Sequence, residues 1–407
     1  MTTFRSFLTE STALKNDHMP HLEDLMLLYG KPGFDTMLVV LRELQKTVID
    51  SKKASREISV SVKWDGAPAI VFGPDPVDGQ FFVSTKSALN QSPKIAKTHS
   101  EIEERWSNQL VKDVLHQALD ELPALQSPIV LQGDVLFADA MPYHVEHLEG
   151  LDYIVFTPNA LTYALPVRDY DHRQFVFGIA LHTMYQGDLT NMQSRPINLD
   201  TYLTLAHAER VWTVNGLNDM SRISAMSSDD QFDLHNALTQ IVQLVANDFD
   251  FSIFRILSEG GLDELIKQYQ NSLIRAGKTL NPLAMADDLW RFITEKRDKA
   301  VNSRKTARGQ GNVQLKYELA LNAAMLNRNS LYQFFALYQQ VMAVKDMIID
   351  HLNKAVKIPT FLKTPDGYKR TAPEGFVVTL RSGEMVKLVN RAYFSRLNFG
   401  VQTWHQE

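Results

Sequence analysis

Hydrophobic positions recur at two spacings along this chain, and the changes of spacing divide it into four segments. Residues 1–54 follow a helical period and residues 55–185 mostly alternate as strands do. Residues 186–370 return to the helical period, and strands resume in residues 371–407. The pattern predicts an α+β fold with an N-terminal helical region, a core of mixed or antiparallel sheet in two parts, and a large helical insertion between them.

The elements within these segments follow from local signals. We expect strands within 57–63, 68–75, 79–87, 127–137, 151–157 and 173–183, with a turn at 73–79 and a helix near 101–122. The segments 374–380 and 384–390, joined by Arg381-Ser382-Gly383, predict a β-hairpin. In the insertion we expect helices near 231–247, 262–276, 282–300 and 313–354. The aromatic residues of 331–340 recur at helical spacing, so we expect them on the buried face of a helix.

The N-terminal region has one break and one polar cluster. The sequence GKPGFD at 30–35 interrupts the helical pattern, and Asp35 is a suitable N-cap for the helix that follows. Before it, His18, His21, Glu23 and Asp24 lie close together in sequence. They are compatible with a metal site, but acidic residues at a helix start are more often there to cap it and to complement its dipole.

Composition narrows the class of protein. The 407 residues are 44% hydrophobic and 22% charged, which is typical of a globular chain and excludes a fibrous or disordered one. No stretch approaches the ~20 apolar residues needed to span a bilayer, and the N-terminus does not resemble a secretory signal. Cysteine is absent, so disulfides, thiolate nucleophiles and Cys-ligated zinc are excluded. We therefore expect a cytoplasmic protein with no membrane partner.

Four charged residues on or beside predicted strands carry the candidate chemistry. Lys63 ends a strand and precedes Asp65-Gly66, Asp134 follows a glycine within a strand, Glu374 opens the hairpin, and Lys387 lies in its second strand. We expect them on strands of one sheet, converging on one site. Lysines neutralise phosphate oxygens, carboxylates hold a divalent metal ion, and a desolvated lysine can act as a nucleophile.

Each of these residues also has a simpler interpretation. Lys63 could extend its charged end from a strand terminus to solvent, and Asp65-Gly66 could be only a turn. Glu374 and Lys387 could form an exposed cross-strand ion pair, which contributes less than ~1 kcal/mol.

The same pieces resemble a known superfamily. KWDG at 63–66 resembles the nucleophile motif Lys-x-Asp-Gly of the covalent nucleotidyltransferases, which include ATP-dependent RNA and DNA ligases and mRNA capping enzymes. QGDVLF at 132–137, RQFVFGIAL at 173–181, EGFVV at 374–378 and MVKLVN at 385–390 resemble the later motifs, in the same order. Parts of the chain also resemble uncharacterised proteins of large tailed bacteriophages, which would place it in the host cytoplasm.

The resemblance implies an ATP-grasp-like adenylation core and a role for each matching residue. Lys63 would attack the α-phosphate of ATP and form lysyl-AMP, and Lys387 would contact that phosphate. Asp65 and Glu374 would hold the nucleotide and its metal ion, and Gly66, Lys86 and Asp134 would contact the nucleotide. Asp134 and Glu374 would hold Mg²⁺ or Mn²⁺. Phe177 is the implied base-stacking aromatic, with Phe175 as the alternative.

The chain also departs from the superfamily pattern. Pro68 stands where arginine is usual, Asp134 stands where glutamate is usual, and Lys387 is the single lysine of a motif that normally has two. After Lys387 there is no room for the C-terminal OB domain of DNA ligases and capping enzymes. These departures favour the RNA-ligase-like branch, or transfer of AMP to a protein or small molecule, or a non-catalytic binding descendant.

A basic stretch in the insertion suggests a nucleic-acid contact. Arg304, Lys305 and Arg308 form its densest part and could bind a phosphate backbone. The formal charge of the chain is −5, so this contact would be local. RNA is the expected partner in preference to DNA, and an ordinary solvated loop is the alternative.

Overall fold

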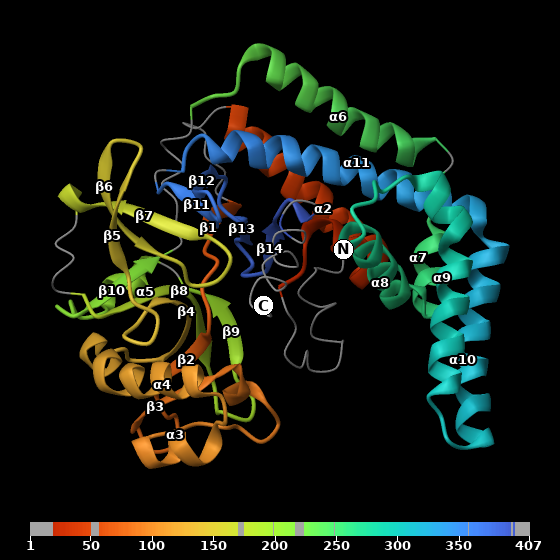
Figure 1. The fold of residues 1–407 in the computed structure, drawn as a ribbon. Coiled ribbons are helices and arrows are strands. Elements are labelled where there is room, and N and C mark those ends of the chain that lie inside the picture. The colour runs from red at the N-terminus through yellow and green to blue at the C-terminus, as the bar shows by residue number, and fades with distance from the viewer. Residues whose placement is uncertain are drawn as a thin grey trace. The chain divides into compact units, whose positions relative to one another are not determined.

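The computed structural model describes residues 19–49, 57–169, 175–197, 199–215, 224–247, 249–356, 358–391 and 394. The chain divides into two compact units, which Figure 1 shows as ribbons. The first, here called the sheet unit, comprises Met1–Met19, Arg56–Met220 and Asn353–Lys387. The second, the helical unit, comprises Pro20–Ser55, Ser221–Leu352 and Leu388–Glu407. The predicted α+β class is confirmed.

The largest sheet of the sheet unit has six strands in the order β10-β8-β4-β2-β3, with β9 pairing beside β8. β10 runs parallel to β8, and the other described pairs are antiparallel, so the sheet is mixed. The strands are β2 (Ala69–Pro74), β3 (Phe81–Thr85), β4 (Val130–Phe137), β8 (Phe177–Gln186), β9 (Gln193–Pro196) and β10 (Val211–Asn215).

Helices α3 (His99–Arg105) and α4 (Gln109–Glu121) cover one face of this sheet. Alternate strand residues such as Phe72, Leu131 and Ile179 pack there against Ile102 and Leu115 of the helices. The helix predicted near 101–122 is therefore two helices, because Trp106 has left the helical conformation and Asn108 caps α4. Short 3-10 turns η3 (Lys86–Leu89) and η4 (Leu122–Leu125) connect the neighbouring elements.

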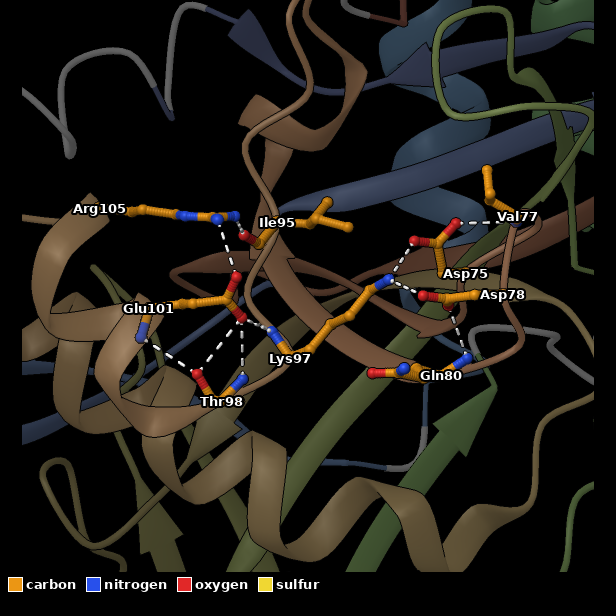
Figure 2. A network of polar contacts seen from close by, with 9 residues as sticks. All are labelled: Asp75, Val77, Asp78, Gln80, Ile95, Lys97, Thr98, Glu101 and Arg105. Atoms are coloured by element: carbon orange, nitrogen blue, oxygen red, sulfur yellow. Dashed lines mark hydrogen bonds and ion pairs between the residues drawn. The ribbon is translucent and has the colours of Figure 1, made fainter.

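A polar network fixes the β2–β3 turn beside the start of α3 (Figure 2). Lys97 forms ion pairs with Asp75 and Asp78 of the turn, at 2.6 and 2.7 Å. Thr98 and Glu101 form a reciprocal capping box at the N-terminus of α3. Because the hydrogen bonds to Asp75 and Asp78 raise the pKa of Lys97, this lysine remains protonated and is a structural cation.

Two smaller sheets complete the sheet unit. One has the order β1-β13-β14, and the other has the order β12-β11-β7-β6-β5. Their strands are β1 (Ile58–Lys63), β13 (Gly375–Leu380), β14 (Met385–Leu388), β5 (His144–Leu148), β6 (Leu151–Phe156), β7 (Thr162–Pro166), β11 (Thr360–Thr364) and β12 (Gly367–Thr371), and η5 (Val167–Asp169) follows β7. The predicted hairpin is confirmed, since β13 and β14 are neighbours and the Leu380 amide donates to the Glu384 carbonyl at 2.8 Å.

The continuous helical period predicted for 186–370 is wrong at both ends. β9, α5 (Leu199–Thr204) and β10 lie at its start, and β11 and β12 lie at its end. All four strands belong to sheets of the sheet unit. β9 and β12 have no buried residue, so neither strand has the apolar alternation on which a strand prediction depends.

The helical unit contains η1 (Leu22–Asp24), α2 (Leu25–Ile49), α6 (Ser228–Ala246), α7 (Ser252–Glu259), α8 (Leu262–Arg275), α9 (Pro282–Asn302), α10 (Ala307–Leu326) and α11 (Arg328–Asn353). The helix predicted over 313–354 is two helices that meet at Asn327. The aromatic residues of 331–340 are core, as predicted, since Phe334, Phe335 and Tyr338 are buried. None of the helices in the described residues is long and apolar enough to cross a bilayer.

The predicted break in the N-terminal helix is confirmed, but the prediction that the next helical segment begins at Asp35 is wrong. α2 kinks at Gly30, whose φ of 60° suits glycine. Helical geometry then resumes before Pro32, a residue that the first turn of a helix accepts. Asp35 consequently lies inside the second segment and pairs with Lys31 at 2.5 Å, so it is not an N-cap.

In the polar cluster before α2, Glu23 and Asp24 lie in the first turn of η1, as the dipole interpretation expects, but no side chain caps that helix and the cluster's described residues form no metal site. Glu23 pairs with Lys345 at 2.7 Å, and Asp24 binds Tyr338 and Arg391. Both acids are buried. His18 lies outside the described residues. The sequence could not predict these pairings because they join positions more than three hundred residues apart.

Candidate active site

Lys63 and Glu374 meet where β1 ends and β13 begins. The antiparallel register places Lys63 opposite Gly375, so the residue before Gly375 lies beside the lysine. The Lys63 Nζ forms an ion pair with the Glu374 Oε2, and the two side chains are 21% and 14% exposed. A lysine that is largely removed from water and held by one carboxylate is the arrangement needed for an amine nucleophile and its proton acceptor.

The residues after Lys63 anchor the loop that follows β1. The Trp64 ring packs on Tyr163 with 4.7 Å between ring centroids. The Asp65 carboxylate accepts hydrogen bonds from the Asn159 side chain at 2.8 Å and from the Ala160 and Leu161 amides at 2.9 and 3.1 Å. In this structure Asp65 holds the β6–β7 turn in place, and its role as a nucleotide or metal ligand stays a prediction.

Gly66 allows this loop to lie against β4. A Cβ atom at Gly66 would come within 2.7 Å of the Asp134 Cβ and 3.0 Å of the Val135 carbonyl oxygen. Two backbone hydrogen bonds complete the contact, from the Ala67 amide to the Val135 carbonyl at 3.0 Å and from the Val135 amide to the Pro68 carbonyl at 3.1 Å. Pro68 follows a cis peptide bond. The Lys-x-Asp-Gly motif is thus placed directly beside Asp134.

Asp134 has a partner that the sequence did not indicate. The His182 Nε2 lies 3.5 Å from the Asp134 Oδ1, and its Nδ1 lies 2.7 Å from the Thr183 Oγ1. Burial by itself raises the pKa of Asp134, but the charge of His182, with those of Lys63 and Lys86, outweighs it and the pKa is lowered. His182 sits at a bulge in β8. The sequence does hold a hint of this role. Gly178, Ala180 and His182 stand at alternate positions of one strand, and His182 is the polar residue among them.

Three lysines contribute to the same electrostatic cluster. Burial lowers the pKa of Lys387, and the positive charges of Lys63 and Lys86 lower it further. Burial raises the pKa of Glu374, against the opposing charge of Lys63. The predicted convergence of Lys63, Glu374, Lys387 and Asp134 is therefore supported by mutual electrostatic coupling. Their expected position on one sheet is wrong, because Asp134 belongs to the six-stranded sheet, whereas Lys63 and Lys387 belong to the β1-β13-β14 sheet and Glu374 directly precedes β13.

Phe177 is not part of this cluster, which corrects its predicted base-stacking role. Asp134 pairs with Ala180 across β4 and β8, so Ala180 and Gly178 share its face. Phe177 points to the opposite face, where it is fully buried in the core under α3 and α4. Phe175 lies before the strand and is half-buried.

Other aromatic side chains occupy the face of Asp134. Trp212 pairs with Gly178 in the sheet and stacks with Phe137 at 6.0 Å between centroids. It also meets Trp64 edge-on at 6.2 Å. A ring contributed by β10 was missed because that strand was assigned to the helical insertion.

Among the described residues, no three His, Asp or Glu side chains converge as a metal site. Nucleotide-bound Mg²⁺ needs one or two carboxylates, and phosphate oxygens and water supply the remaining ligands. Asp134 and Glu374 both interact with the Lys63 charge, and their role as metal ligands stays a prediction.

The predicted nucleic-acid residues lie in the helical unit. Arg304 and Lys305 are exposed in the turn between α9 and α10, and Arg308 is exposed in the first turn of α10. Residues 299–317 contain five basic residues and no acidic residue. The turn therefore presents a positively charged surface.

The comparisons with known proteins add one family and no named relative. A family model described as a family of unknown function (DUF6267) matches residues 16–403. No curated protein matches the chain. No solved structure matches it either.

Proposed function

We propose that this chain, which belongs to the DUF6267 family of unknown function, is an ATP-dependent adenylyltransferase that works through lysyl-AMP at Lys63. The observation that carries the proposal is the Lys63–Glu374 ion pair beside Asp134, within electrostatic reach of Lys86 and Lys387. The resemblance of KWDG and the later motifs to the covalent nucleotidyltransferases gives the same assignment to Lys63, Glu374 and Lys387.

The electrostatics of the lysines support a polyphosphate ligand. Lys63 and Lys86 both lower the pKa of the partly buried Lys387, which means that the three positive charges repel one another. Such a cluster is unfavourable by itself, and an anionic ligand would relieve the repulsion. A nucleoside triphosphate supplies several negative charges at the spacing of neighbouring side chains.

The proposed reaction uses groups that are already adjacent. Glu374 accepts a proton from the Lys63 ammonium, and the raised pKa of this buried carboxyl makes it a better base. The Lys63 amine then forms a P–N bond to the α-phosphorus as the bond from that phosphorus to the bridging oxygen breaks, and the second proton of the amine passes to solvent. Pyrophosphate leaves with the electron pair, and Lys387 stabilises the charge that develops on the phosphate oxygens.

Asp134 and Glu374 would hold Mg²⁺ or Mn²⁺ together with the nucleotide. Such an ion, when bound, draws charge from the phosphates of ATP and from the leaving pyrophosphate. His182 holds one oxygen of Asp134 at 3.5 Å, which orients the carboxylate.

The proposed acceptor of AMP is an RNA end, as in an RNA ligase. In that second step an acceptor oxygen attacks the AMP phosphorus, the P–N bond breaks, and Lys63 recovers a proton. The exposed basic residues Arg304, Lys305 and Arg308 favour a polynucleotide over a neutral substrate. The formal charge of −5 supports a second candidate, transfer of AMP to a protein or a small molecule.

Intact mass spectrometry tests the first step. Protein incubated with ATP and Mg²⁺ should gain the mass of one AMP, and Lys63→Ala should gain none while it keeps its circular dichroism spectrum and melting temperature. Lys97→Ala is the matched control, because the Lys97 side chain is 20% exposed and also ion-paired, in the network of Figure 2. It should retain AMP capture.

Two outcomes would contradict the proposal. Capture that persists in Lys63→Ala would exclude Lys63 as the nucleophile. Tight ATP binding without any covalent AMP, in protein purified free of nucleotide, would instead favour a non-catalytic binding role.

The same protein then tests the acceptor. Sealing of broken RNA would support the ligase assignment, and transfer of labelled AMP to protein without sealing would support the second candidate.

A further inference from the structure

Two histidines of the sheet unit meet across helices α3 and α4. The Nδ1 atoms of His99 in α3 and His116 in α4 lie 2.7 Å apart, which is hydrogen-bond distance. Both helices pack on the same face of the six-stranded sheet. The two side chains are 54% and 26% exposed, so dissolved ions have access to the pair.

The second nitrogen of each ring lies against a carboxylate. The His99 Nε2 is 3.1 Å from the Asp120 Oδ1, and the His116 Nε2 is 2.8 Å from the Glu103 Oε1. Hydrogen bonds from His116 and from Lys112 lower the pKa of Glu103, which favours its ionised form. Because an ionised carboxylate can only accept a hydrogen bond, both Nε2 atoms carry a hydrogen.

This arrangement determines what the two Nδ1 atoms can do. A neutral imidazole has one N–H, and when that hydrogen is on Nε2 the Nδ1 atom presents a lone pair. Two lone pairs 2.7 Å apart repel each other and form no hydrogen bond. The arrangement therefore calls for a cation between the rings, which is either a proton or a metal ion.

We propose that His99 and His116 bind a transition-metal ion of the Cu²⁺ or Ni²⁺ class through their Nδ1 atoms, with water completing the coordination. Two imidazole bonds of about 2.0–2.1 Å at right angles, as in tetragonal sites of these ions, place the nitrogens roughly 2.9 Å apart. That is close to the 2.7 Å found here. The tetrahedral geometry of zinc needs a wider separation, roughly 3.3 Å. Rotation of the half-exposed His99 ring directs both lone pairs at one ion.

The surroundings of the rings support the same assignment. Histidines that bind a metal ion usually donate the other ring N–H to a carboxylate, which fixes the tautomer and the ring orientation. Asp120 and Glu103 each accept such a bond. The backbone at His99 is set by the capping box of Thr98 at the start of α3 (Figure 2), and His116 lies within α4. Both ligands are thus on helices rather than loops.

A bound ion would cross-link α3 to α4 over the connection at 106–108. The two rings are 17 residues apart in sequence and on different helices, so they meet only when both helices are in place. A ligand that binds the folded state and not the unfolded one stabilises the fold. This site is separate from the proposed lysyl-AMP chemistry, and its test does not depend on it.

Copper binding to tag-free protein tests the site. Titration calorimetry with Cu²⁺ should show one tight site in the wild type, and the electron paramagnetic resonance spectrum should show nitrogen hyperfine splitting. His99→Gln and His116→Gln should each weaken that site by at least about tenfold, and Asp120→Asn should weaken it by about tenfold. His147→Gln is the matched control, because His147 is an exposed histidine beside one carboxylate, Asp152, at 2.8 Å. It should bind Cu²⁺ like the wild type.

A melting experiment tests the cross-link. Ni²⁺ at about a hundred times its dissociation constant should raise the melting temperature of the wild type by roughly 5 °C and leave that of His99→Gln unchanged. Circular dichroism of the variants without metal shows that α3 and α4 are kept.

Three results would overturn the metal site. One is an equal Cu²⁺ affinity in the wild type and in both histidine variants. Another is a wild-type copper spectrum with oxygen ligands alone. The third is an absence of Cu²⁺ binding together with a proton shared by the two Nδ1 atoms in ¹⁵N NMR, which would identify the cation between the rings as a proton.

Discussion

Replacing Asp65 distinguishes a structural carboxylate from a ligand-binding one. Asp65→Ala removes the acceptor for the Ala160 and Leu161 amides, and both of those residues are buried. Each buried amide left without a partner costs about 1–3 kcal/mol. The Asn159 side chain loses its bond as well, but it is exposed and water can replace the acceptor. We therefore expect Asp65→Ala to destabilise the sheet unit by about 4 kcal/mol.

Asp65→Asn is the matched substitution. Its remaining carbonyl oxygen can accept from both amides, and the exposed Asn159 can rotate to offer an acceptor to the new NH₂ group. The free energy of unfolding then falls by only about 1–2 kcal/mol, because the hydrogen bonds remain but their acceptor is no longer charged. AMP capture by Asp65→Asn should stay within about threefold of the wild type, because the loop geometry is kept.

Thermal unfolding followed by tryptophan fluorescence measures the difference, since Trp64 adjoins Asp65. At roughly 2–4 °C per kcal/mol for a unit of this size, Asp65→Ala should melt about 10 °C lower and Asp65→Asn only a few degrees lower. The reasoning would be refuted if Asp65→Ala melted like the wild type while both variants lost AMP capture. That result would make Asp65 a nucleotide or metal ligand.

Three further predictions concern the core, the helical unit and the basic turn. Phe177→Ala should lower the free energy of unfolding by about 3–5 kcal/mol in chemical denaturation, because it empties a core position, and the affinity for ATP in calorimetry should not change. Burial raises the pKa of Asp346 to about 6, so the folded wild type loses stability as pH rises from about 4 through 6. Asp346→Asn should therefore be more stable by up to about 3 kcal/mol at pH 8, with no advantage at pH 4, in urea titrations at both pH values. Changing Arg304, Lys305 and Arg308 together to Gln should reduce the salt dependence of single-stranded RNA binding by about 2 in log–log slope, measured by fluorescence anisotropy; an unchanged slope would place the RNA contact elsewhere.

Local patterns predicted the elements that have one buried and one polar face. β1 and the β13–β14 hairpin were found in this way, as were the long helices α6, α8 and α9. Strands with little buried surface gave no such signal. β12 has no buried residue, and β5 has none either, so neither strand could be recognised from apolar alternation.

The candidate site was predicted in part. The wrong predictions share one cause, which is that the sequence does not show the three-dimensional surroundings of a residue. The order of motifs along the chain identified Lys63 and Glu374, which are 311 residues apart and form an ion pair. Periodicity shows that alternate residues of β8 face opposite ways, but not which face carries the site. Phe177 was therefore assigned to the wrong face, and His182 on the correct face was missed. For Asp65, the sequence could not show that a turn 94 to 96 residues away would occupy its carboxylate.

The separation of β1 from β13 has a consequence for how the protein is made. β1 pairs with β13 alone in the described part of the chain, and the largest segment of the helical unit, Ser221–Leu352, is encoded between them. A ribosome adding about 5–20 residues per second needs roughly 15 to 60 s to cover the 311 residues from Lys63 to Glu374. During that interval β1 is an unsatisfied strand edge on the nascent chain, open to wrong partners or to a chaperone. The lysine that we propose to be the nucleophile lacks its carboxylate over the same period, so nucleotide chemistry at Lys63 would begin only after the segment Ser221–Leu352 has left the ribosome.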